Sequence, residues 1–154
     1  MDNKAAIQDT NPEELFGIIQ NKFNLGEVDI HTYSPLVLAF IGDGIYDLVV
    51  RSILVGEGNR AVEKLHKDKS KVVKAQSQAI MAEALAPIMT QEESDIYRRG
   101  RNAKSYTMAK NASMSDYRKA TGFEALCGYL YLKKDMSRLL ELISEGLAAL
   151  KENN

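Results

Sequence analysis

The chain has a single cysteine, Cys127, among its 154 residues. One thiol excludes an internal disulfide and a cysteine-rich zinc site, and its apolar neighbours predict a buried, unreactive side chain. No apolar stretch reaches the roughly 20 residues that a membrane span needs. The first residues also lack the apolar core of a signal peptide. We therefore expect a protein of a reducing, cytoplasmic compartment.

A strong overall charge is absent as well, because the formal net charge is -1. This argues against a generally basic coat but not against local basic surfaces, since an average hides the distribution. The positive residues are concentrated in two segments, 60–74 and 97–119. With 45% hydrophobic and 27% charged residues, the composition is typical of one globular domain with a real core.

Helical periodicity recurs along the chain and alternating strand patterns do not, so we expect an all-α fold built as a helical bundle. Thr90 and Glu93 form a predicted capping box, and Ser115 is the predicted cap of a helix from 116. The expected helices cover 11–22, 34–54, 59–66, 69–85, 90 to about 100–104 and 116–132, and a last helix begins at Asp135 or Ser137 and runs to 150. We expect one domain over 11–150, a flexible segment at 1–10 and a frayed tail at 151–154.

Two acidic residues lie in otherwise apolar, glycine-containing helical segments, Asp43 within 36–50 and Glu124 within 120–132. A charged side chain among residues that favour burial is unfavourable unless something compensates it. A divalent cation held by oxygen ligands is one such compensation. The two carboxylates therefore predict a metal site.

The same two segments contain Gly42, Gly44, Gly122 and Gly128. Each glycine costs about 1 kcal/mol relative to alanine inside a helix, and a close helix crossing would offset that cost. If the helices touch at these glycines, the two carboxylates reach one cation. Alternatively, the glycines only permit tight packing and the acids pair with arginines at the rim. The residues alone leave both interpretations open.

Asp47 lies one helical turn after Asp43 and four residues before Arg51. Residues four apart share a helix face, so Asp47 is placed to bind a metal beside Asp43 or to form an ordinary ion pair with Arg51, which explains it without a metal. Both roles stay open at this stage.

A compact basic run with two amides lies between the acidic segments. Its cations and amides are Arg98, Arg99, Arg101, Asn102, Lys104, Lys110 and Asn111. Cations at a helix end favour the negative end of its dipole, which accounts for some of the arginines. The run continues into a polar loop, however, and RNA binding without sequence preference needs mainly phosphate and 2′-hydroxyl contacts. Acidic metal ligands and a phosphate-binding surface together indicate a nuclease.

Several ordered motifs resemble the ribonuclease III family. The segment FIGDGIYDLVV at 40–50 is similar to the signature helix of its catalytic domain, and FEALCGYL at 123–130 is similar to its second acidic motif. Three further segments resemble the compact Mini-III subgroup: RGRNAK at 99–104, KNAS at 110–113 and YRKATGFEAL at 117–126. The resemblance covers about residues 30–150.

The resemblance implies a ribonuclease III-type endonuclease domain that hydrolyses double-stranded RNA with Mg²⁺ and leaves 5′-phosphate ends. It implies Asp43 and Glu124 as catalytic and metal-binding residues, in a homodimer with one active site per subunit. The implied substrate is the precursor of large-subunit (23S) ribosomal RNA, whose ends are matured, with a ribosomal protein assisting its presentation. No separate double-stranded-RNA-binding domain is expected, so the catalytic domain itself would hold the RNA.

The chain departs from the full-length family at two acidic positions, where it has Ala39 and Thr121. Asp43 and Glu124 carry over, whereas the position of Asp47 is not reliably a metal ligand in the family. Fewer carboxylates imply more water-mediated coordination, which Mg²⁺ tolerates because it keeps much of its water.

Two other functions remain open. The missing acids are compatible with a non-catalytic helical RNA-binding dimer, which would bind duplex RNA without cleaving it. A structural interaction domain whose basic loop binds an acidic protein would not bind RNA at all.

Overall fold

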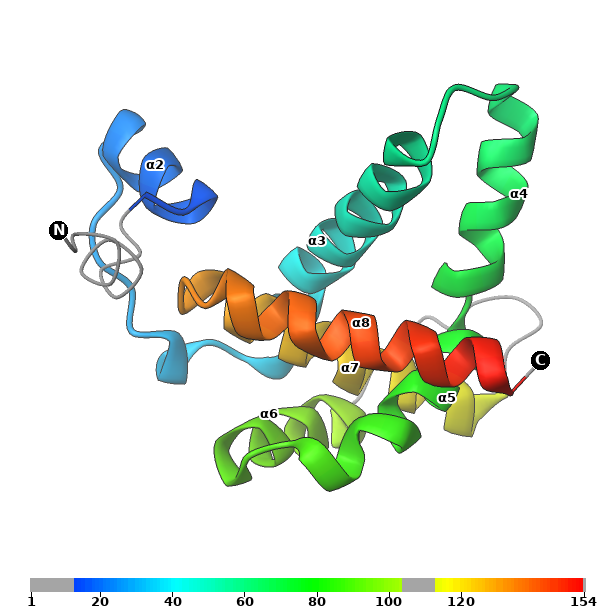
Figure 1. Ribbon diagram of the computed structural model, residues 1–154. Helices are drawn as coiled ribbons and strands as arrows, with labels where there is room; N and C mark the ends of the chain where they lie inside the picture. The colour runs from blue at the N-terminus through cyan, green and yellow to red at the C-terminus, as the bar shows by residue number, and fades with distance from the viewer. Residues whose placement is uncertain (1–12, 104–112, 154) are drawn as a thin grey trace, which may run out of the picture.

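The structure is a computed structural model that describes residues 13–103 and 113–153 (Figure 1). These residues form helices and connecting segments without any strand, so the all-α prediction is confirmed for this part of the chain. None of their helices is both long and apolar enough to cross a membrane. The elements are α2 (Leu15–Lys22), η1 (Ile30–Thr32), α3 (Pro35–Gly56), α4 (Val62–Val73), α5 (Ala75–Leu85), η2 (Ala86–Ile88), α6 (Gln91–Asn102), α7 (Met114–Leu132) and α8 (Met136–Glu152).

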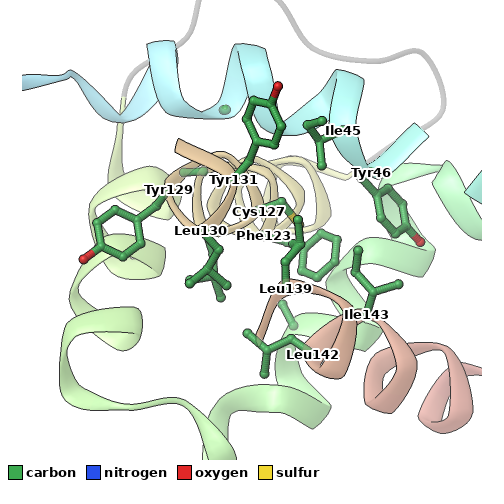
Figure 2. Close-up of a cluster of buried hydrophobic side chains, with 14 of the residues drawn as sticks. Ile45, Tyr46, Phe123, Cys127, Tyr129, Leu130, Tyr131, Leu139, Leu142 and Ile143 are labelled. Atoms are coloured by element: carbon green, nitrogen blue, oxygen red, sulfur yellow. The ribbon is translucent and has the colours of Figure 1, made fainter. Parts of the chain in front are cut away.

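Helix α7 is the central element of the bundle. From residue 120 to residue 132, every side chain except that of Glu124 is buried. Helices α3, α5, α6 and α8 all pack against α7. Figure 2 shows α7 along its axis, with side chains of α3 and α8 meeting it from different sides. A helix that is apolar nearly all round must be covered in this way.

The core itself is aromatic and aliphatic. The rings of Tyr46 and Phe123 meet edge to face, with their centroids 5.1 Å apart (Figure 2). The Tyr46 hydroxyl donates a hydrogen bond to the Val72 carbonyl at 2.7 Å, which ties α3 to the end of α4. Cys127 is buried as predicted, and burial raises the pKa of its thiol well above the usual range. Such a thiol is unreactive.

Glycines allow α7 to approach two neighbouring helices closely. A Cβ atom on Gly42 would overlap the Glu124 carbonyl, and one on Gly128 would overlap the Leu38 carbonyl, so α3 and α7 cross in backbone contact at these positions. Gly122 instead lies against Tyr97 of α6. Gly44 faces no atom within 4 Å. The predicted crossing of the two acidic helices is therefore present, but only Gly42 and Gly128 make it.

Several helix boundaries follow the cap residues of the sequence. The Ser34 side chain accepts a hydrogen bond from the Val37 amide, and Asp135 accepts one from the Arg138 amide. Thr90 and Glu93 form the complete predicted capping box. Each of these side chains satisfies an amide that the first turn of a helix leaves without a backbone partner.

Other boundaries differ from the prediction. Helix α4 continues to Val73, and the break from α5 is at Lys74 rather than at 67–68. The Ser77 hydroxyl and the Gln78 amide donate to carbonyls of the last turn of α4 and hold this break, a contact that periodicity does not reveal. Helix α7 begins at Met114, because the Ser113 side chain, not that of Ser115, accepts from the Asp116 amide.

The helices near the two ends of the chain also differ from their expected bounds. Helix α2 begins at Leu15, later than the expected start at 11. Helix α8 extends to Glu152, two residues into the segment 151–154 for which we expected a frayed tail. The expected flexible segment 1–10 and most of the expected loop after α6 lie outside the described residues.

The crossing predicts a strong dependence of stability on Gly42. Gly42→Ala should lower the free energy of unfolding by about 3 kcal/mol or more, because the added methyl group meets backbone that cannot move aside. Gly56→Ala is the matched control, since Gly56 is in the same helix and faces no atom within 4 Å. Gly56→Ala should change the free energy of unfolding by no more than about 1 kcal/mol. Urea unfolding of both variants measures this, and equal effects would contradict the account.

Candidate active site

Asp43 and Glu124 come together at the α3–α7 crossing. Gly42 contacts the Glu124 backbone, and Asp43 is the next residue of α3. The negative charge of Asp43 acts on the Glu124 carboxyl group and disfavours its ionised form. Asp43 is exposed and Glu124 is half-buried, so the pair lies at the surface end of an otherwise apolar crossing.

The environment of Glu124 makes its negative charge unfavourable without compensation. Burial, followed by the negative charge of Asp43, raises the pKa of Glu124 from 4.5 to about 8. A hydrogen bond from Gln78 acts in the opposite direction and favours the charged form. That bond joins Gln78 Nε2 to Glu124 Oε2 over 3.1 Å. A half-buried carboxylate beside a second one favours a neighbouring cation.

The donor set is small but fits a magnesium ion. In residues 13–103 and 113–153, no cluster of three or more histidine, cysteine, aspartate or glutamate side chains is placed to bind a metal. Ala39 is buried, and the Thr121 hydroxyl donates to the Tyr117 carbonyl at 3.0 Å. Neither residue supplies the carboxylate that the full-length family has at its position. Two adjacent carboxylates with room for water are the kind of site in which Mg²⁺ keeps several water ligands.

The side chain of Asp47 forms two ion pairs. Its Oδ2 accepts from Arg51 at 2.6 Å, and its Oδ1 accepts from Lys69 at 3.0 Å. These two cations hold the pKa of Asp47 below its usual value against the effect of partial burial. The expected Asp47–Arg51 pair is thus present, with Lys69 of α4 as a second partner.

The described part of the basic run lies at the C-terminal end of α6. Arg98 is paired with Asp95 at 3.0 Å, and the Arg101 guanidinium lies 5.8 Å from the centre of the Tyr97 ring. Arg99 and Asn102 are exposed. The remaining members of the run, Lys104, Lys110 and Asn111, lie outside the described residues.

A basic hollow of about 320 Å³ extends this surface from α6 to the start of α7. Its lining residues are Arg101, Asn102, Met114, Ser115, Arg118 and Lys119. Arg118 was not among the predicted RNA-binding residues, although it belongs to the same positively charged segment. The hollow faces polar and cationic groups, which suits a phosphate oxygen.

Gln78 is the residue near the carboxyl pair that the sequence analysis missed. It occupies a core position of α5, one and two turns before Met81 and Leu85, which are both buried. A polar side chain at an apolar position of a helix was the signal that could have identified it. Its contact with Glu124 depends on three helices and cannot be read from spacing.

The raised pKa of Glu124 predicts how the stability of the metal-free protein depends on pH. Between about 4.5 and 8, the folded state binds a proton at Glu124 that the unfolded chain does not bind. The free energy of unfolding should therefore fall as pH rises through this range and level off above it. Glu124→Gln should remove that part of the slope. Urea unfolding at pH 5, 6.5 and 8 in chelator measures the difference, and parallel profiles would contradict the assignment.

Comparisons with known proteins agree with the motifs. The family described as Ribonuclease III domain matches residues 36–135, from α3 to the end of α7. A protein named Mini-ribonuclease 3 from Thermoanaerobacter sp. (strain X514) is 41% identical over 140 residues, which are 91% of this chain and 99% of that protein. Its namesake from Brevibacillus brevis is 44% identical over 120 residues, 78% of this chain and 90% of that protein.

A solved structure shares the fold. The crystal structure of a protein from Fusobacterium nucleatum superposes with a TM-score of 0.69 at 30% identity, covering 75% of this chain and 93% of that one. The sequence matches extend over both acidic helices and the basic segment between them. The chain therefore belongs to the ribonuclease III family, in its compact Mini-III group, and is a ribonuclease, a hydrolase.

Proposed function

We propose that this protein is an endoribonuclease that hydrolyses double-stranded RNA with Mg²⁺, and that Asp43 and Glu124 are its catalytic carboxylates. The observation that carries the proposal is their meeting at one helix crossing, in a chain of this family. Separated carboxylates in apolar segments have no structural need for each other, since their charges repel. A cation bound by both carboxylates would offset this repulsion.

Asp43 and Glu124 would hold the ion, and no third acid of the described residues is needed for a hydrated Mg²⁺. Bound there, Mg²⁺ would activate a water, orient the scissile phosphate and offset charge on the leaving oxygen. The protein's own part is to hold the two carboxylates at one surface position. Glu124 is half-buried, and the hydrogen bond from Gln78 Nε2 holds one of its carboxylate oxygens.

The basic surface at the end of α6 would position the duplex through its phosphates. Arg98, Arg99, Arg101 and Asn102 lie on it, and Arg118 borders the adjoining hollow. Lys104, Lys110 and Asn111 are proposed as further contacts. Phosphate contacts fix the register of a nucleic acid without reading bases, which suits an enzyme that recognises duplex shape.

The biological setting is also a proposal. The chain would act in the cytoplasm as a single catalytic domain over residues 11–150, on the precursor of 23S ribosomal RNA. A ribosomal protein would assist substrate presentation, because one small domain offers few phosphate contacts. Support comes from the motifs shared with the Mini-III group.

A homodimer would place two such sites on one duplex, with one cut in each strand. The outer face of α3 supports this proposal, since Val37, Phe40 and Leu48 are 48%, 80% and 50% exposed. Beside Phe40, an apolar hollow of about 530 Å³ lies between α3 and the segment that follows α2. An exposed aromatic ring next to a hollow suits a two-fold interface, in which each copy offers both features.

The nuclease proposal predicts the outcome of a cleavage assay. Wild-type protein should cut a structured 23S precursor duplex in Mg²⁺ and not in chelator. Asp43→Asn and Glu124→Gln should each reduce the cleavage rate by at least about 100-fold, because each removes a ligand charge from the metal. Asp47→Asn is the matched acidic control and should keep most activity, since Asp47 is occupied by Arg51 and Lys69. Gel analysis with end mapping gives the rates and the product ends.

Binding measurements on the same proteins separate the alternatives. Asp43→Asn should retain the fold and salt-dependent binding of duplex RNA. RNA that wild-type protein binds but leaves intact in Mg²⁺ would favour the non-catalytic RNA-binding dimer. No RNA binding at all would favour an interaction domain and would contradict the proposal.

The dimer proposal predicts a change of mass in solution. Phe40→Asp should convert the protein to a monomer at micromolar concentration, because it places a charge in the centre of an apolar interface. Leu140→Asp is the control, since Leu140 is also an exposed apolar residue (43%) but belongs to α8 and not to α3. Light scattering after size-exclusion chromatography measures both. A wild-type monomer, or a dimer unaffected by Phe40→Asp, would exclude this interface.

A further inference from the structure

The side chain of Gln78 is the most deeply buried polar group beside the carboxyl pair. It is 2% exposed, on α5 between the end of α4 and the core. Its Nε2 donates to the Val73 carbonyl at 2.8 Å and to Glu124 Oε2 at 3.1 Å. Both partners are acceptors, so the orientation of the amide is determined: its NH₂ group must face them.

This orientation leaves the other end of the amide without a partner. Gln78 Oε1 is buried and accepts no hydrogen bond from the described residues. A buried carbonyl without a partner costs about 1–3 kcal/mol, whereas an apolar side chain of similar size would avoid that cost. Packing alone therefore does not explain a glutamine at this core position. Its two N–H groups are the part of the side chain that is used.

The two hydrogen bonds connect the active-site carboxylate to a fixed point of the backbone. Val73 ends α4, and the break after it is also held by Ser77, whose hydroxyl donates to the Lys71 carbonyl. Tyr46 holds the same turn through the Val72 carbonyl. Gln78 is thus anchored on one side, and its second N–H reaches one oxygen of Glu124. The other oxygen of Glu124, Oε1, takes no part in this hydrogen bond.

We infer that Gln78 is a positioning residue of the metal site: its Nε2 holds Glu124 in the one orientation that presents a carboxylate oxygen beside Asp43. The inference rests on the proposed function. The described residues offer two carboxylates to this site, so each must be oriented well, because no third acid among them compensates for one that rotates away. Partners that orient metal ligands contribute about 10- to 100-fold to metal affinity.

The test compares two glutamines of α5. Gln78→Met keeps the length of the side chain but has no N–H donor, and Gln76→Met changes an exposed glutamine of the same helix. Free Mn²⁺ measured by electron paramagnetic resonance gives metal affinity in the absence of RNA. Gln78→Met should weaken Mn²⁺ binding about tenfold, and Gln76→Met should not change it. Thermal unfolding checks that both variants are folded.

Cleavage kinetics supply a second readout. For Gln78→Met, the Mg²⁺ concentration for half-maximal rate should rise about tenfold, while the rate in saturating Mg²⁺ stays close to that of the wild type. A general structural defect would instead lower the saturating rate. Unchanged metal affinity in folded Gln78→Met, with normal binding by wild type, would overturn this inference alone. Absence of metal binding by wild type would overturn the proposed function as well.

A measurement on the wild-type protein keeps the inference testable if Gln78→Met does not fold. The side-chain amide of Gln78 gives a pair of signals in a ¹⁵N-correlated NMR spectrum. Addition of Mg²⁺ should shift this pair, because its N–H donates to a proposed metal ligand, and should leave the Gln76 pair in place. A Gln78 pair that does not respond to saturating Mg²⁺ would overturn the inference.

Discussion

The contact between α3 and α7 through Gly42 and Gly128 is the constraint on which the rest of the structure depends. Without side chains at these positions, the two backbones meet directly, and the residues next to the glycines are fixed relative to one another. Asp43 and Glu124 are brought together for this reason, although neither contributes attraction of its own. The packing of the helices thus offsets the repulsion between the two acids. Helix α7 is central to this packing, because its second half is buried.

The electrostatics of the site follow from this arrangement. Glu124 loses part of its hydration and gains a negative neighbour, so its neutral form is favoured until a cation arrives. If the proposed ion binds there, proton and metal ion compete for the same carboxylate, and metal binding depends on pH. Asp47, one helical turn after Asp43, is by contrast paired with Arg51 and Lys69.

Much of the fold was predictable because its signals are local. Thr90 and Glu93 form the capping box that their spacing predicts, the helices capped by Ser34 and Asp135 begin near their expected starts, and the apolar stretch after Ala120 becomes the buried half of α7. The break at Lys74 was not predictable, since side chains of Ser77 and Gln78 hold it through bonds that local propensity does not contain. The cap at Ser113 was missed because Ser115, two residues later, is an equally good cap by composition.

The site was predictable in part. Acids in apolar, glycine-containing segments indicated Asp43 and Glu124, and the structure places these two together. The same argument could not decide the role of Asp47, because its second partner, Lys69, comes from another helix. Gln78 was missed because its partner Glu124 also comes from another helix. Only its burial and this contact distinguish it from other glutamines.

The central claim is that the α3–α7 crossing forms one metal site from Asp43 and Glu124. Its most direct test is a crystal structure of the protein grown with Mn²⁺, with anomalous scattering used to locate the ion. The account predicts an anomalous peak between the two carboxylates, within coordination distance of an oxygen from each. A well-ordered crystal with no peak there, or with a peak bound by one carboxylate and Asp47, would contradict it.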